Sequence, residues 1–90
     1  MGDVLVKNTG VTIPIAPHNG KDYTLLELQA YVGGNIETVY FSNGKILIID
    51  EEGKLKGKLP NHIATGWLMV EGYMDYVAGD ALLIEGEHLR

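Results

Sequence analysis

Three consecutive carboxylates, Asp50, Glu51 and Glu52, form the only acidic run in the sequence. Carboxylate oxygens are the ligands that hard cations such as Ca²⁺ prefer. Neighbouring residues on an extended strand point to opposite faces, however, and Gly53-Lys54 directly after the run is typical of a turn. The run also lacks the alternating acidic spacing of an EF-hand loop. We therefore predict a solvated turn here rather than a metal site.

The histidines His18, His62 and His88 are the other side chains suited to acid–base chemistry at neutral pH. They are scattered along the chain, whereas a metal site on a helix needs a spacing such as i and i+4. His62, beside Asn61 and Thr65, could serve as the general base of a minimal hydrolase, but a place in the first turn of a helix is the better explanation. The chain has no cysteine, no G-x-S-x-G elbow and no phosphate-binding glycine loop. The sequence thus predicts no catalytic residue, no metal and no cofactor.

Aromatic and methionine side chains gather in one stretch of the sequence, at Trp67, Met69, Tyr73, Met74 and Tyr76. Core packing is the default interpretation of such a cluster. Methionine and aromatic residues are also enriched at the centre of protein interfaces. A domain of 90 residues need not have room for all of them inside, so an exposed interaction patch is the alternative.

The spacing of apolar and turn residues predicts the elements that position these side chains. Helices are expected from Thr24 to Gly33 and from Asn61 to Gly72, each with its own N-cap. Asn43-Gly44 predicts a hairpin with a type I′ turn. Strands are expected over 3–7, 11–15, 36–41, 45–50 and 78–84, and the tail 85–90 is expected to fray.

Finer features of these elements also follow from the sequence. Pro14 cannot donate to a strand ladder, so its strand is expected at a sheet edge. The continuous apolar run of 45–50 favours a central strand covered on both faces. In the first helix, Thr24 and Glu27 form a capping box. Its apolar stripe is expected to contain Leu25, Leu28 and Val32, extended by Leu26 and Ala30.

These elements predict one α+β domain over residues 1–90, in which two helices pack on a mostly antiparallel sheet of about five strands in the order ββαββαβ. The net charge of −5 argues against a nucleic-acid partner. No apolar run is long enough to span a membrane, and the N-terminus has no signal-peptide pattern. Together with the lack of cysteine, these features favour a cytoplasmic location.

Several separated short motifs occur in the following order: Val32-Gly33-Gly34, Ile36-Glu37, the run from Asp50 to Leu55, Leu59-Pro60-Asn61, Ala64-Thr65 and Gly79-Asp80. Their order resembles the small bacterial and phage proteins of the domain of unknown function 3846 family, over residues 24 to 86. The resemblance implies an accessory protein of a phage, prophage or other mobile element, or of its bacterial host. It implies no activity, because none is established for the family.

The sequence therefore favours a non-enzymatic protein-interaction module, which binds an unknown protein partner or itself. A small-molecule or nucleotide-binding protein, for example one that sequesters its ligand in phage–host conflict, is the alternative. The candidate binding surface consists of Glu37, Glu51, Asn61, Thr65 and Trp67. The first four are polar residues of the motifs, which core packing explains less readily, and Trp67 belongs to the aromatic cluster.

Overall fold

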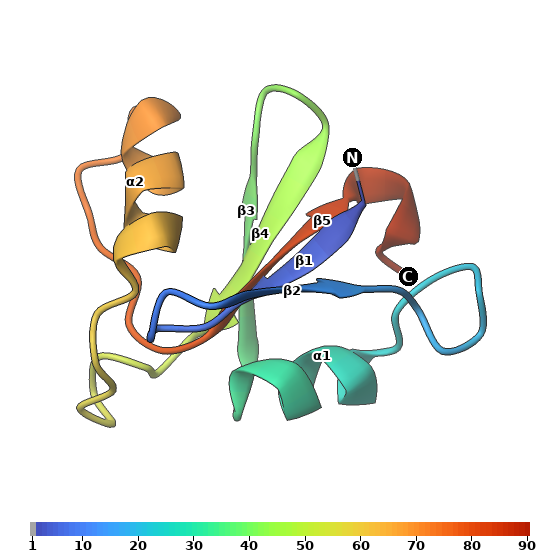
Figure 1. Cartoon of the computed structure of the whole chain (residues 1–90), viewed down its shortest axis with the longest axis horizontal. Coiled ribbons are helices and arrows are strands. Elements are labelled where there is room, and N and C mark those ends of the chain that lie inside the picture. Colours follow the sequence, from blue (N-terminus) through green and yellow to red (C-terminus); the bar gives the residue numbers. More distant parts are fainter. Residues whose placement is uncertain (1) are drawn as a thin grey trace.

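Five strands form a single antiparallel sheet with the order β2-β1-β5-β4-β3. The computed structural model describes residues 2–90 (Figure 1). Its strands are β1 (Asp3–Val6), β2 (Thr12–Ile15), β3 (Ile36–Tyr40), β4 (Lys45–Asp50) and β5 (Ala81–Glu85), and its helices are α1 (Leu25–Val32), α2 (His62–Val70) and a short 3-10 helix (Gly86–His88). The predicted α+β class and the order ββαββαβ are confirmed.

The two helices lie on opposite faces of the sheet, so that the domain has three layers (Figure 1). Since side chains alternate along a strand, β4 sends Ile46 and Ile48 into the core under α1 and Leu47 into the core under α2. The prediction that this strand is covered on both faces is correct. Each helix therefore buries its own apolar side chains on a different side of one shared sheet.

Helix α1 begins with the predicted capping box: the Thr24 hydroxyl accepts from the Glu27 amide, and the Glu27 carboxylate accepts from the Thr24 amide. Its predicted stripe is only partly correct. Leu28 and Val32 are buried, whereas Leu25 and Leu26 are 56% and 77% exposed. A short helix touches the sheet along a narrow line, and only residues one turn apart can lie on that line.

The hairpin between β3 and β4 forms at the predicted place but not with the predicted turn. Among residues 2–90 only glycines have a positive φ, so Asn43 cannot occupy a type I′ position. Instead, the Gly44 amide donates to the Phe41 carbonyl and Gly44 has a φ of 84°. A three-residue loop with glycine in the left-handed position therefore closes the hairpin.

The C-terminal tail is ordered, in contrast to the predicted fraying. His88 places Nδ1 2.7 Å from a carboxylate oxygen of Asp3, and the Tyr23 hydroxyl donates to the same oxygen at 2.8 Å. Asp3 is buried, and it needs these partners because an unpaired buried carboxylate is costly. Burial and the neighbouring Asp3 carboxylate raise the pKa of Tyr23. The tail folds back because it completes the hydrogen bonds of Asp3.

Two elements in the second half of the chain have bounds that differ from the predicted ones. Strand β5 begins at Ala81 rather than at residue 78, because Gly79 turns the chain with a φ of 91°. Helix α2 begins after Asn61, as predicted, and ends at Val70 before Gly72.

Within residues 2–90, neither helix approaches the length and apolar character that a bilayer crossing requires.

Candidate functional site

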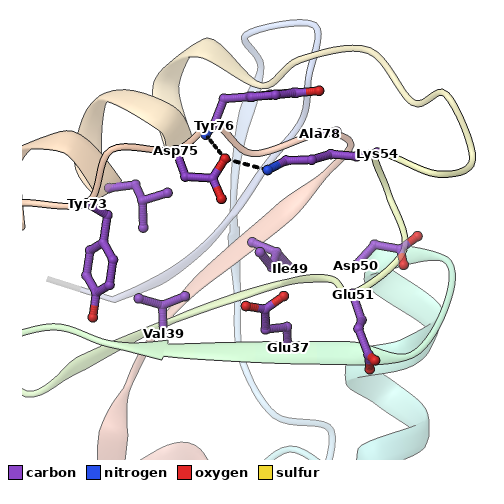
Figure 2. A pocket seen from close by; sticks show the side chains of 11 residues that line it. Glu37, Val39, Ile49, Asp50, Glu51, Lys54, Tyr73, Asp75, Tyr76 and Ala78 are labelled. Atoms are coloured by element: carbon purple, nitrogen blue, oxygen red, sulfur yellow. Dashed lines mark hydrogen bonds and ion pairs between the residues drawn. The ribbon is translucent and has the colours of Figure 1, made fainter.

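A hollow of about 160 Å³ lies on the α2 side of the sheet, between the strands β3 and β4 and the segment that joins α2 to β5 (Figure 2). Apolar side chains of Val39, Ile49 and Leu68 line it from within. Its charged and aromatic lining comes from Glu37, Glu51, Lys54, Tyr73, Asp75 and Tyr76. The hollow thus combines an apolar interior with a charged rim.

An ion pair ties the two walls of the rim together (Figure 2). The Lys54 ammonium group donates to the Asp75 carboxylate and lies 4.5 Å from the centre of the Tyr76 ring. The same carboxylate oxygen accepts from the Tyr76 amide at 2.8 Å. Hydrogen bonds from Lys54 and from the Tyr76 amide lower the pKa of Asp75, so its carboxylate is charged at neutral pH. The turn after β4 is thereby linked to the segment after α2.

Glu37 and Glu51, predicted as binding residues, both line this hollow. Figure 2 shows the Glu37 carboxyl group turned into the hollow and the Glu51 carboxyl group turned away from it. Both residues are exposed, and neither makes a hydrogen bond or ion pair through its side chain within the described part of the chain. The arrangement suits a cationic side chain with an aliphatic stem, which could contact Val39 and pair with Glu37.

The other three predicted residues lie elsewhere. Asn61 is buried, with 1% of its surface exposed, so it presents no binding surface. The Thr65 hydroxyl accepts from the Val77 amide at 2.9 Å and so holds the segment after α2. Trp67 is half-buried beside a separate apolar hollow with Phe41 and Val70. The structure brings together Glu37 and Glu51 but not the remaining candidates.

Five large side chains on α2 and the following segment are exposed to solvent. We call them the α2 patch: Met69 (62%), Val70 (87%), Tyr73 (46%), Met74 (99%) and Tyr76 (45%). Met69, Met74 and Tyr76 line one shallow hollow, while Tyr73 and Tyr76 line the hollow of Figure 2. For these residues the exposed arrangement is observed rather than core packing. Spacing alone could not distinguish them from Ala64 and Leu68, which are buried.

Residues 3–88 match the family described as Domain of unknown function (DUF3846). The chain belongs to this family. The match begins well before the region of the sequence resemblance and therefore includes the first hairpin. No curated protein and no solved structure matches the chain.

The acidic run of this DUF3846 domain is only in part the solvated turn that its sequence predicts: Glu51 and Glu52 are exposed on the turn, whereas Asp50 is buried. The Asp50 side chain is fully buried, 2.6 Å from the Lys58 ammonium group and 3.0 Å from that of Lys56. The two lysines also donate to the carbonyls of Val32 and Gly33 at the end of α1. Asp50 thus anchors two lysines that complete the C-terminal hydrogen bonds of a helix. The alternation of Lys54, Lys56 and Lys58 was the only sequence signal for it.

Metal binding finds no support in this arrangement. Over residues 2–90, no three His, Asp or Glu side chains converge as metal ligands would. Asp50 is occupied by two lysines, and Glu52 is exposed on the turn. The His62 side chain is exposed and makes no hydrogen bond among the described residues. On the α2 side, the hollow of Figure 2 has apolar side chains inside and the carboxylates of Glu37, Glu51 and Asp75 in its lining.

The Asp50 cluster gives the domain a specific acid sensitivity. Burial alone would raise the pKa of Asp50, but hydrogen bonds from Lys58, the Glu52 amide and Lys56 outweigh it and lower this pKa from 3.8 to about 2. The stability that depends on Asp50 is therefore complete above about pH 4 and is lost as the pH falls towards 2. We expect Asp50→Asn to lower the free energy of unfolding at neutral pH by about 2 kcal/mol.

Urea denaturation of wild type and Asp50→Asn over this pH range checks the expectation. The variant should lose less stability than wild type between about pH 4 and pH 2. Asp75→Asn is a matched control, because it removes an exposed ion-pair partner, and exposed pairs contribute little to stability. Parallel losses in wild type and Asp50→Asn would contradict the assignment.

Proposed function

We propose that this domain is a non-enzymatic interaction module that binds a protein partner through the α2 patch. The carrying observation is the exposure of Met69, Val70, Tyr73, Met74 and Tyr76 on one helix and its exit segment, where Met69, Met74 and Tyr76 line one hollow. Adjacent exposed apolar side chains of this size mark interaction surfaces more often than scattered ones. Methionine adapts its shape to a partner, and tyrosine adds hydrogen bonding at low entropic cost.

The charges around the patch indicate the partner's chemistry. Glu37, Glu51 and Asp75 lie at the hollow beside Tyr73 and Tyr76, and the whole chain carries a net charge of −5. A partner with an apolar centre and lysine or arginine at its rim would be complementary. We place the module in a bacterium, as an accessory protein of a mobile element or its host, because of the family resemblance. We place it in the cytoplasm because the chain has no cysteine.

A small-molecule or nucleotide ligand is less well supported at the hollow of Figure 2. Pockets for drug-sized ligands usually enclose roughly 300–1,000 Å³, and the hollow of Figure 2 has about 160 Å³. The carboxylate of Glu37 would repel a phosphate group there. Lys54, the cation at the rim, is already paired with Asp75. A protein side chain fits this hollow better than a nucleotide.

The test is the capture of a partner by tagged protein with charges placed in the patch. We expect the double variant Val70→Asp/Met74→Asp to lose, by at least tenfold, whatever protein the wild type retains from a bacterial lysate. Both positions are almost fully exposed, so the fold should be unaffected. Leu55→Asp is the matched control, since Leu55 is 87% exposed on a turn outside the patch. Equal retention by wild type and the double variant would contradict a role for the patch.

A further inference from the structure

The two edges of the sheet differ in whether they can accept another strand. At the β2 edge, the Lys7 amide donates to the Val11 carbonyl, and the register pairs Val4 with Pro14. Antiparallel pairing alternates, so Thr12 and Pro14 turn their backbone groups outward. Pro14 has no amide hydrogen, and this edge is therefore blocked in its middle.

The β3 edge has no such block. The Phe41 amide donates to the Lys45 carbonyl, and the Glu51 amide donates to the Asn35 carbonyl. With the observed register, the alternation leaves the backbone groups of Ile36, Thr38 and Tyr40 pointing away from β4. Within residues 2–90, no strand pairs with this side of β3. The backbone amide and carbonyl groups of these three alternate residues are thus free to form hydrogen bonds with another strand.

Apolar side chains border this open edge on the α1 side. Tyr40 is 64% exposed on β3 itself. Gln29 donates to Asn35 just before β3, which shows that this flank of α1 faces the β3 side. Leu25 is four residues before Gln29, so it lies on the same flank, and it is 56% exposed. An exposed edge with apolar neighbours is the usual geometry for adding a strand from another chain.

We propose that two copies of this chain associate through antiparallel pairing of β3 with β3, which joins their sheets into one of ten strands. This surface is distinct from the α2 patch, and the proposal does not rest on the proposed function. A two-fold axis beside Thr38 gives the longest overlap: Thr38 faces Thr38 of the second copy, and Ile36 faces its Tyr40. Such isologous pairing is the commonest symmetry of homodimers.

Charge selects the same register. With Thr38 opposite itself, Glu37 faces Val39 of the second copy on the α2 side. A shift of two residues in one direction would set the two Glu37 carboxylates directly opposite each other, which is unfavourable. The same shift in the other direction would leave only residues 38–40 of the strand paired. In the favoured register, Val39 and Glu37 of the second copy also extend the hollow of Figure 2, because the same two residues line it in the first copy.

The size of the contact sets its strength. Five residues of paired strand bury less than the roughly 1,000 Å² of a stable interface. The exposed parts of Tyr40 and Leu25 from both copies add apolar area on one face. The net charge of −5 on each copy opposes association. We therefore expect a weak, reversible dimer whose population rises with protein concentration.

Sedimentation equilibrium of the purified chain tests the proposal without any partner. The mass should rise from 9.8 kDa towards twice that value with concentration. Thr38→Pro removes the central outward amide and should keep the mass of a single copy at every concentration. Thr12→Pro, the same change at the blocked edge, should leave the association unchanged. A wild type of constant single-copy mass would overturn the proposal, as would a dimer that Val70→Lys abolishes and Thr38→Pro does not.

Cross-linking keeps the test decisive if Thr38→Pro fails to fold. The chain has no cysteine, so a single introduced one reports its own position. Directly paired residues place their Cα atoms about 5.5 Å apart, within disulfide range. Thr38→Cys should therefore form a covalent dimer under mild oxidation. Tyr40→Cys should not, because the two copies of residue 40 would be separated by about 13 Å along the strands. Equal cross-linking of both variants would refute the register.

Discussion

Replacing Asn61 by alanine is expected to lower the free energy of unfolding by about 3 kcal/mol or more. The Asn61 side chain is buried and makes three hydrogen bonds. Its Oδ1 accepts from the Ala64 amide at 3.1 Å, and its Nδ2 donates to the carbonyls of Val6 and Gly79 at 2.8 and 3.0 Å. Alanine removes all three of these hydrogen bonds in the interior, at the place where β1, α2 and the segment before β5 meet.

Urea denaturation followed by circular dichroism measures this loss. Thr24→Ala in α1 is the matched control, because Thr24 caps its helix in the same way but joins no third element. Its loss should be about 1 kcal/mol, the usual contribution of an N-cap. Asn61→Asp keeps the accepting oxygen and removes the donated hydrogen bonds, so its loss should exceed that of Thr24→Ala. Equal losses in Thr24→Ala and Asn61→Ala would show that Asn61 acts as a cap alone.

Asn61 also shows how far the sequence leads. A polar residue before a helical pattern predicts an N-cap, because capping depends on residues three apart in the chain. The two hydrogen bonds to Val6 and Gly79 cross 55 and 18 residues of sequence, and no local pattern indicates them. The same residue was therefore predicted correctly as a cap and incorrectly as part of a surface.

Asp50 and the tail were mispredicted for the same reason. An acidic run before Gly-Lys resembles a solvated turn when only neighbours in sequence are considered. The lysines that bury Asp50 reach it because the loop folds back over the end of α1. His88 likewise meets Asp3 from the other end of the chain. Contacts of this range depend on the order of strands in the sheet, which places β1 and β5 side by side.

Some residues of the candidate site could likewise be found from the sequence, whereas others are brought together only by the fold. Glu37 and Glu51 could be selected as polar residues of recurring motifs, and the structure places both at one hollow. Lys54, Asp75 and Tyr76 complete its rim, but their ion pair and ring contact join a turn after β4 to the segment after α2. The exposure of Met69 depends on how α2 is rotated on the sheet. The spacing of apolar residues does not determine that rotation when both sides of a helix are apolar. The exposure of Met74 depends on the path of the segment that follows α2.

Replacing Gly53 by alanine is expected to destabilise the domain by about 2 kcal/mol or more, although the change adds a single methyl group. Gly53 is buried, and a Cβ atom there would lie 2.5 Å from the Ala78 carbonyl oxygen. Neither atom can give way cheaply, since both are fixed by the backbone. The turn would have to move away from Ala78, which lies in the segment before β5. Ala78 also lines the hollow in Figure 2.

Gly66→Ala is the matched substitution with the opposite expected sign. Gly66 lies inside α2 with open space where a Cβ atom would be placed, and alanine is the better helix former by about 1 kcal/mol. Thermal denaturation should therefore show a lower melting temperature for Gly53→Ala and a higher one for Gly66→Ala. If Gly53→Ala were as stable as wild type, the close contact between the turn and Ala78 would be absent in solution. The rim pair of Lys54 and Asp75 would then lack the rigid support that a preformed binding surface requires.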